Sequence, residues 1–189
     1  MRKVIVSMYM TLDGRVDALQ EWAAPHDSEH IARYHSDLLA NSDGLIIGRR
    51  TYEVFAAIWP PRLGKIAYGD KINSMAKHVA STTLTDLKWG NSHLLGGGDV
   101  AEGVAKLKQE PGQDLVVYGG PSLVQTLQRH DLVDEYRIML HPVVLGKGTG
   151  LFDDGDPRVD LDLVGTGVLP GGVAVLTYRP AGGETGRVG

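Results

Sequence analysis

Two segments in which an apolar run stops at glycine and a helical pattern follows constrain the fold more than any other feature. They are GLIIGRRTYEVF, residues 44–55, and DLVVYGGPSLVQTL, residues 114–127. A short apolar run bounded by glycine indicates a buried strand, and the spacing of apolar residues after it indicates a helix. Strands that alternate with helices predict a largely parallel sheet that is covered on both faces.

The rest of the chain continues this alternation and closes with consecutive strands. Strands are expected at 3–10, 44–48, 93–97, 114–118 and 134–146, at the end of 71–81, and twice within 159–180 around a Pro-Gly-Gly turn. Helices are expected at 27–42, 49–59, 99–110 and 121–130, and briefly at the start of 71–81. This order predicts an α/β three-layer α-β-α sandwich around a mixed, mostly parallel sheet with an antiparallel C-terminal hairpin. Without a repeat or a linker, we expect one domain over 1–180 and a flexible tail over 181–189.

Composition excludes several classes of function. The chain has no cysteine, so disulfides and cysteine-based metal sites are ruled out and a reducing cytoplasm is the expected location. The net charge is −4 and no Lys/Arg block occurs, which argues against a nucleic-acid partner. No apolar run approaches the roughly 20 residues of a membrane span. A small-molecule ligand is the expected partner.

The glycine pair Gly119–Gly120 predicts a phosphate-binding turn. Ligands of open α/β sheets bind at the carboxyl ends of strands, where glycine lets the backbone approach closely. The free N–H groups that open the next helix attract phosphate, and Pro121 removes an N–H that has no partner in the helix. The alternative is a tight strand-to-helix turn that binds nothing.

The turn at Gly48 strengthens the phosphate interpretation. Arg49, Arg50 and Thr51 occupy the first helical turn after it, where cations are disfavoured unless an anion compensates them. Guanidinium groups bind phosphate in a bidentate manner. The alternative is two solvated arginines with Thr51 as a local cap. Two such turns suit a long ligand with phosphates at separate points, and NADP(H) has that shape. The G-x-G-x-x-G fingerprint of the standard dinucleotide site is absent.

These segments resemble the dihydrofolate reductase superfamily, and within it the bacterial branch related to the C-terminal reductase domain of the bifunctional riboflavin biosynthesis protein. The motifs that carry the resemblance are SMYMTLDGRV, GLIIGRRTYEVF, DLVVYGGPSLVQTL and DLVDEYRIMLHPVVLGKGTGLF. The resemblance implies an NADPH-dependent reductase that forms a homodimer. Its closest implied reactions are the reduction of a ribosylaminopyrimidine in riboflavin synthesis and dihydrofolate reduction.

The resemblance also implies roles for individual residues. Arg49, Arg50 and Thr51 would contact the adenosine 2′-phosphate and the pyrophosphate, and LDGRVDALQEW, residues 12–22, would be a mobile loop beside the nicotinamide. The remaining implied cofactor contacts are Ser81, Thr82 and Thr83 along the adenosine, and Gly119, Gly120, Ser122 and Leu123 around the pyrophosphate.

Two aspartates are candidates for the catalytic acid. Asp27 lies five residues after Trp22, a spacing that resembles the substrate carboxylate of dihydrofolate reductase. Its alternative role is a plain helix N-cap. Asp13 follows the first strand at its carboxyl end, and its alternative role is an Asx-turn with Gly14.

Other polar residues are weaker candidates. His26, Glu29 and His30 could hold a metal, but the H-E-x-x-H order is missing and no metal is expected. Arg62 and Lys65 could meet a substrate phosphate. His141 is expected to pack in or beside the sheet. Two alternatives to the reductase stay open at this point: a nucleotide-binding or sensor protein without turnover, and a purely structural module.

Overall fold

The fold is built on one eight-stranded sheet with the order β4-β3-β2-β5-β1-β6-β8-β7. The computed structural model describes residues 1–23, 29–95, 98–152 and 155–182. The strands are β1 (Val4–Thr11), β2 (Ser42–Gly48), β3 (Ala76–Ala80), β4 (Ser92–Leu94), β5 (Asp114–Val117), β6 (Glu135–His141), β7 (Leu161–Leu169) and β8 (Val173–Pro180).

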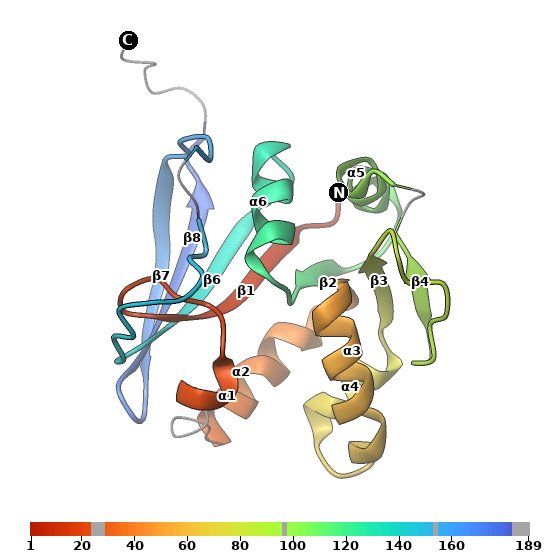
Figure 1. Cartoon of the computed structure of the whole chain (residues 1–189), viewed down its shortest axis with the longest axis horizontal. Helices are drawn as coiled ribbons and strands as arrows, with labels where there is room; N and C mark the ends of the chain where they lie inside the picture. Colours follow the sequence, from red (N-terminus) through yellow and green to blue (C-terminus); the bar gives the residue numbers. More distant parts are fainter. Residues whose placement is uncertain (24–28, 96–97, 153–154, 183–189) are drawn as a thin grey trace.

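Helices cover both faces of this sheet (Figure 1). They are α1 (Leu19–Trp22), α2 (Glu29–Ala40), α3 (Arg49–Ile58), the 3₁₀ helix η2 (Pro60–Arg62), α4 (Ala67–Ser74), α5 (Val100–Gln109) and α6 (Pro121–Arg129). Helices α5 and α6 pack on one face, and α2, α3 and α4 pack on the other. The three-layer sandwich expected from the sequence is therefore confirmed. No helix of the described ranges is long and apolar enough to cross a bilayer.

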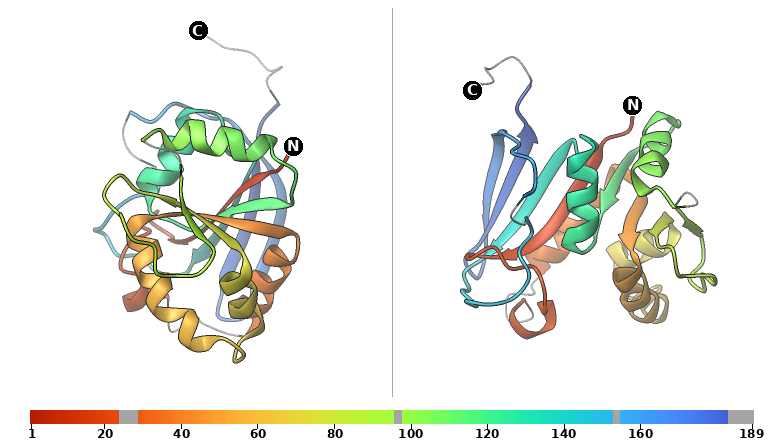
Figure 2. Two further views of the ribbon diagram at one scale, coloured as in Figure 1. Left: turned by 90° about the vertical axis from the view of Figure 1, so that its right-hand side faces the viewer. Right: turned by 45° about the horizontal axis from the view of Figure 1, so that its top comes forward.

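The sheet is mixed but mostly parallel. Strand β1 pairs in parallel with β5 and β6, and β2 pairs in parallel with β3 and β5. Strand β8 is antiparallel to both β6 and β7. The final hairpin stands at one edge of the sheet and β3 and β4 form the opposite side (Figure 2). The antiparallel C-terminal hairpin predicted from the Pro-Gly-Gly turn is thus confirmed.

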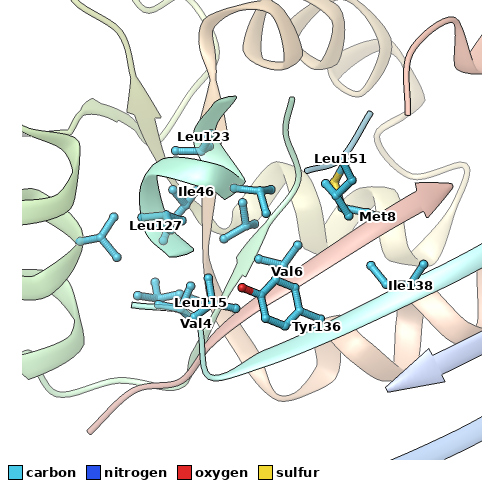
Figure 3. Close-up of a cluster of buried hydrophobic side chains, with 14 of the residues drawn as sticks. Val4, Val6, Met8, Ile46, Leu115, Leu123, Leu127, Tyr136, Ile138 and Leu151 are labelled. Carbon is cyan, nitrogen blue, oxygen red and sulfur yellow. The ribbon is translucent and has the colours of Figure 1, made fainter. Parts of the chain in front are cut away.

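The central strand β1 divides its side chains between two cores. Val4, Val6 and Met8 pack under α5 and α6, and Ile5 packs under α2 and α4. This alternation follows from the pleat, which turns successive side chains to opposite faces. Figure 3 shows Leu123 and Leu127 of α6 above Val4 and Val6. Apolar burial on both faces explains why β1 reads as a continuous apolar run.

Several boundaries differ from the sequence-based expectation. Residues 12–22 are not all loop, because they contain α1. The strand expected over 134–146 ends at His141, where Pro142 lacks the N–H that a ladder needs and the N–H of Val143 turns back to the carbonyl of His141 at 2.8 Å. Helix α4 begins at Ala67, earlier than expected, and β4 is limited to Ser92–Leu94.

Candidate functional site

The two glycine turns predicted from the sequence lie side by side at the carboxyl ends of β2 and β5. Gly48 is the N-cap of α3 and Gly120 is the N-cap of α6, and neither helix has a side-chain cap. A Cβ built on Gly119 would lie 3.7 Å from the backbone nitrogen of Gly48 and 3.1 Å from Leu123 Cδ2. The first turns of two helices therefore present their N–H groups at neighbouring points of one edge.

The space that a side chain would occupy at Gly48 and at Gly120 is empty. A Cβ on Gly48 or on Gly120 would meet no atom within 4 Å. Their φ angles of −77° and −75° are open to any residue. The fold itself therefore does not require glycine at either position. This open cradle beside uncapped helix N-termini fits a phosphate group.

The predicted arginine cluster borders the same edge. The Arg49 Nε donates to Glu53 Oε1 at 2.8 Å, and its Nη1 donates to Thr83 Oγ1 at 2.8 Å. Arg50 is exposed beside it. The structure thus brings the Arg49 turn and the segment around Thr83 into contact, although 34 residues separate them in the chain.

The segment after β3 forms a compact turn at this edge. The Ser81 Oγ accepts hydrogen bonds from the N–H groups of Thr83 and Leu84, at 3.2 and 3.0 Å. The Thr82 and Thr83 side chains are exposed. On α6, Ser122 is exposed, whereas the Leu123 side chain is buried in the core and packs against the Gly119 turn. The role of all these residues in cofactor binding stays a prediction.

A cavity of about 250 Å³ opens next to the glycine turns. Its lining comes from β1, the segment after β1 with the start of α1, α2, α3 with the residue after it, α4, and the turn after β5. The residues are Ser7, Met8, Tyr9, Val16, Leu19, His35, Thr51, Phe55, Trp59, Tyr68, Ile72, Tyr118 and Gly119. Thr51 and Gly119 belong to both the turns and the cavity, so the two features form one continuous site.

A chain of hydrogen bonds crosses the wall of this cavity. The His35 Nε2 lies 2.9 Å from the Tyr9 hydroxyl, and its Nδ1 lies 2.8 Å from the Tyr118 hydroxyl. Burial lowers the pKa of His35 to about 4, so the imidazole is neutral at neutral pH. Burial raises the pKa of Tyr118 well above its usual value. Tyr118 therefore stays protonated, and the neutral imidazole donates to one hydroxyl and accepts from the other.

The predicted catalytic aspartates are not both placed. Asp27 lies outside the described residues, as does His26. Asp13 accepts hydrogen bonds from Thr11 Oγ1 at 2.7 Å and from the N–H groups of Leu145 and Gly146 at 3.2 and 2.8 Å. The Thr11 hydrogen bond is the main cause that lowers the Asp13 pKa to about 2. Asp13 does not line the cavity, and these contacts tie the turn after β1 to the segment after β6.

The remaining candidates lie elsewhere. Glu29 pairs with Arg33 at 3.7 Å and His30 is exposed, and no group of three metal-binding side chains occurs among the described residues. His141 is fully buried against the rings of Tyr9 and Trp22, each with its centroid at 5.1 Å. Since His141 is the last residue of β6, its expected packing in or beside the sheet is confirmed.

Sequence reasoning missed the polar residues of the cavity. The buried residues of α2 are Ile31, His35, Leu38 and Leu39. Position 35 has the correct helical spacing for the inner face. A histidine on the inner face of the helix could have been noticed as a buried polar residue. Its tyrosine partners come from β1 and from the turn after β5, and only the fold brings them together.

Comparison with known proteins places this chain in a family. The RibD C-terminal domain model matches residues 2–175. The uncharacterised protein YyaP of Bacillus subtilis is 31% identical over 185 residues, which cover 94% of this chain and 95% of that protein. Neither the family match nor this relative names a substrate.

Solved structures show the same fold. A putative riboflavin biosynthesis protein from Shewanella superimposes with a TM-score of 0.75 at 23% identity, covering 95% of this chain and 99% of its own. Dihydrofolate reductase from Enterococcus faecalis, complexed with NADP(H), superimposes with a TM-score of 0.65 at 14% identity and covers 94% and 96% of the two chains. The fold is therefore that of dihydrofolate reductase, and by its sequence match the chain belongs to the RibD C-terminal domain family.

Proposed function

We propose that the protein is an NADPH-dependent reductase that transfers a hydride to a small heterocyclic or carbonyl substrate. The observation that carries the proposal is the open cradle over Gly48 and Gly120, two uncapped helix N-termini where the chain itself has no need of glycine. Membership of the RibD C-terminal domain family supports a reductase-like function. Reduction of 5-amino-6-(5-phosphoribosylamino)uracil and dihydrofolate reduction are the closest activities that this membership suggests.

The residues present fit the cofactor. Backbone N–H groups after Gly48 and Gly120 would hold its pyrophosphate, together with Ser122 and the backbone of Leu123. Arg49 and Arg50 would hold the 2′-phosphate, because guanidinium groups recognise phosphate in a bidentate manner. Ser81, Thr82 and Thr83 would lie along the adenosine, and Thr51 stands where the cradle meets the cavity. The cofactor supplies the hydride, and the protein supplies position and a proton.

A second function is favoured by one observation. No carboxylate side chain of the described residues lines the cavity, and carboxylates commonly act as acids in enzymes. A nucleotide-binding or sensor protein that holds NADP(H) without turnover is therefore the alternative.

Titration with NADPH and NADH, followed by protein fluorescence, tests the proposal. We expect saturable binding with NADPH preferred, and loss of dihydronicotinamide absorbance when a suitable substrate is added. Tight NADPH binding without oxidation by any heterocycle or carbonyl compound of a broad panel would favour the sensor. Absence of NADPH binding would refute both functions.

A further inference from the structure

The cavity beside the glycine turns offers no counterion to a charged ligand. Among its described lining residues none carries a formal charge at neutral pH, because the one titratable imidazole, His35, is held neutral by burial. Arg62 stacks on the ring of Trp59 with its Cζ 5.7 Å from the centroid, but it does not itself line the cavity, and neither does Lys65. Moving an ionised group into such a site costs far more than moving a neutral ring.

The shape and lining of the cavity suit a planar ring. Phe55, Trp59 and Tyr68 contribute aromatic surfaces, and Val16 and Ile72 contribute aliphatic ones. A volume of about 250 Å³ lies just below the usual range of small-molecule pockets. A ligand of one or two fused rings matches this space.

The hydrogen-bonded chain Tyr9–His35–Tyr118 gives the same cavity a source of protons. When His35 carries its hydrogen on Nδ1, that N–H donates to the Tyr118 oxygen and Nε2 accepts from Tyr9. The Tyr118 hydroxyl proton can then be donated to a ligand. Tyr118 also precedes Gly119, so it stands where the cavity meets the proposed cofactor cradle.

We infer that the cavity binds an uncharged aromatic or conjugated carbonyl compound and that Tyr118 is the proton donor for its reduction. This inference rests on the proposed reductase function. The C=O π bond breaks as hydride from NADPH adds to carbon and the Tyr118 proton adds to oxygen. The Nδ1–H of His35 stabilises the Tyr118 phenolate, and water reprotonates the phenolate after the product leaves. Tyr118 is thus the catalytic residue, and His35 and Tyr9 are positioning residues that hold its hydroxyl and stabilise its phenolate.

The first test measures binding to the protein without cofactor. The probes are 4-formylbenzamide and 4-formylbenzoate, which present the same aldehyde on the same ring and differ in charge. We expect the neutral amide to bind at least about tenfold more tightly by calorimetry, because the carboxylate finds no counterion. Equal affinities, or no binding of either probe up to its solubility limit, would overturn the inference.

The second test removes single hydroxyl groups. Tyr118→Phe should weaken 4-formylbenzamide about fivefold, as expected for one lost hydrogen bond, and should lower kcat with NADPH by about 100-fold or more. Tyr9→Phe should reduce kcat less and change the pH profile of kcat, a readout that a structural role would not move. Tyr136→Phe, a buried tyrosine on β6 outside the cavity, is the matched control and should change neither quantity.

The third test distinguishes Tyr118 from Asp13 as the proton donor, and failure of this inference from failure of the reductase function. Asp13→Asn should leave the pH profile of kcat unchanged if Tyr118 is the donor, whereas an Asp13 donor would make Asp13→Asn inactive and Tyr118→Phe active. If NADPH binds and the neutral aldehyde binds without being reduced, the role of Tyr118 is refuted. In a further outcome, NADPH fails to bind while the neutral probe binds in a Tyr118-dependent way. That result would refute the reductase function but support the inference that the cavity binds an uncharged ligand.

Discussion

Gly48 and Gly120 have nearly the same backbone conformation, with φ −77° and ψ 165° at the first and φ −75° and ψ 163° at the second. Both cap helices that leave adjacent strands of the sheet. A Cβ at either position would point into open space. We propose that glycine is required here by a ligand that approaches the backbone from outside, and a phosphate group is the ligand that helix N-termini favour.

Replacing Gly48 or Gly120 by alanine should weaken NADPH binding but leave the stability of the fold nearly unchanged. Gly48→Ala and Gly120→Ala should change the free energy of unfolding by about 1 kcal/mol or less, because the angles suit any residue and only a weak cap preference is lost. The dissociation constant for NADPH should rise about tenfold, because each methyl group crowds the N–H groups of the cradle. Urea unfolding and calorimetric titration measure the two effects.

Gly90→Ala is the matched control for that experiment. Gly90 is exposed in the loop before β4, and a Cβ there also meets no atom within 4 Å. It should leave NADPH affinity at the wild-type value. Wild-type affinity in both cradle variants would contradict the proposed phosphate site.

Arg49→Ala should weaken NADPH much more than NADH. The guanidinium is half-exposed and pairs with Glu53, so its loss should cost stability only about 0.5 kcal/mol. A charge-assisted contact to the 2′-phosphate is lost only with NADPH, which predicts a selective drop of about tenfold or more. Fluorescence titration with both nucleotides gives the ratio.

Arg33→Ala provides the comparison for Arg49→Ala. Arg33 forms the same kind of surface pair, with Glu29 one turn away on α2. This variant should not change the preference between the nucleotides. An equal loss of NADPH and NADH affinity in Arg49→Ala would argue against a 2′-phosphate contact.

The buried His35 should make folding stability depend on pH. Its pKa is about 4 in the folded protein, against an ordinary value of 6.5, because burial disfavours the charged form. Between these values the unfolded chain binds more protons, so stability falls as pH drops from 6.5 towards 4, by up to about 3 kcal/mol. The groups that face the imidazole are the hydroxyls of Tyr9 and Tyr118 and the rings of Tyr34 and Tyr68.

His35→Gln should flatten this dependence, because an amide keeps hydrogen-bonding capacity but does not titrate. Urea unfolding at a series of pH values measures the slope. Part of the slope should remain, because burial also lowers the pKa of His78. His130→Gln, at an exposed histidine beyond α6, is the control for loss of an imidazole. An unchanged slope in His35→Gln would show that His35 does not titrate as described.

The outer strand β7 is where we propose that the expected homodimer forms. It is the edge strand of the sheet, and Leu163, Val164 and Val168 are 53%, 47% and 78% exposed. Val168→Glu should shift the protein to a smaller species on size-exclusion chromatography with light scattering, because a charge opposes burial of this strand. Leu94→Glu, on the opposite edge strand and with 47% exposure, should leave the assembly unchanged. A monomeric wild-type protein would refute the dimer.

The sequence alone determined the layers of the fold and the two phosphate-binding candidates. The apolar runs that end at Gly48 and Gly119 predict buried strands followed by helices. Such elements can be read from the sequence because their apolar spacing and start signals involve residues that are close in the chain. The same local reasoning extended the strand of His141 too far and overlooked α1. Short elements at boundaries depend on contacts that a local pattern does not contain.

Only the tertiary structure decided how the pieces of the site meet. It placed Thr83 against Arg49, and it joined Tyr9, His35 and Tyr118 from three separate elements around one cavity. It also held Asp13, which the sequence had made a catalytic candidate, in contacts between two loops. The physical reason is that the environment of a polar side chain is set by neighbours distant in the chain, and burial and hydrogen bonding then fix its chemistry.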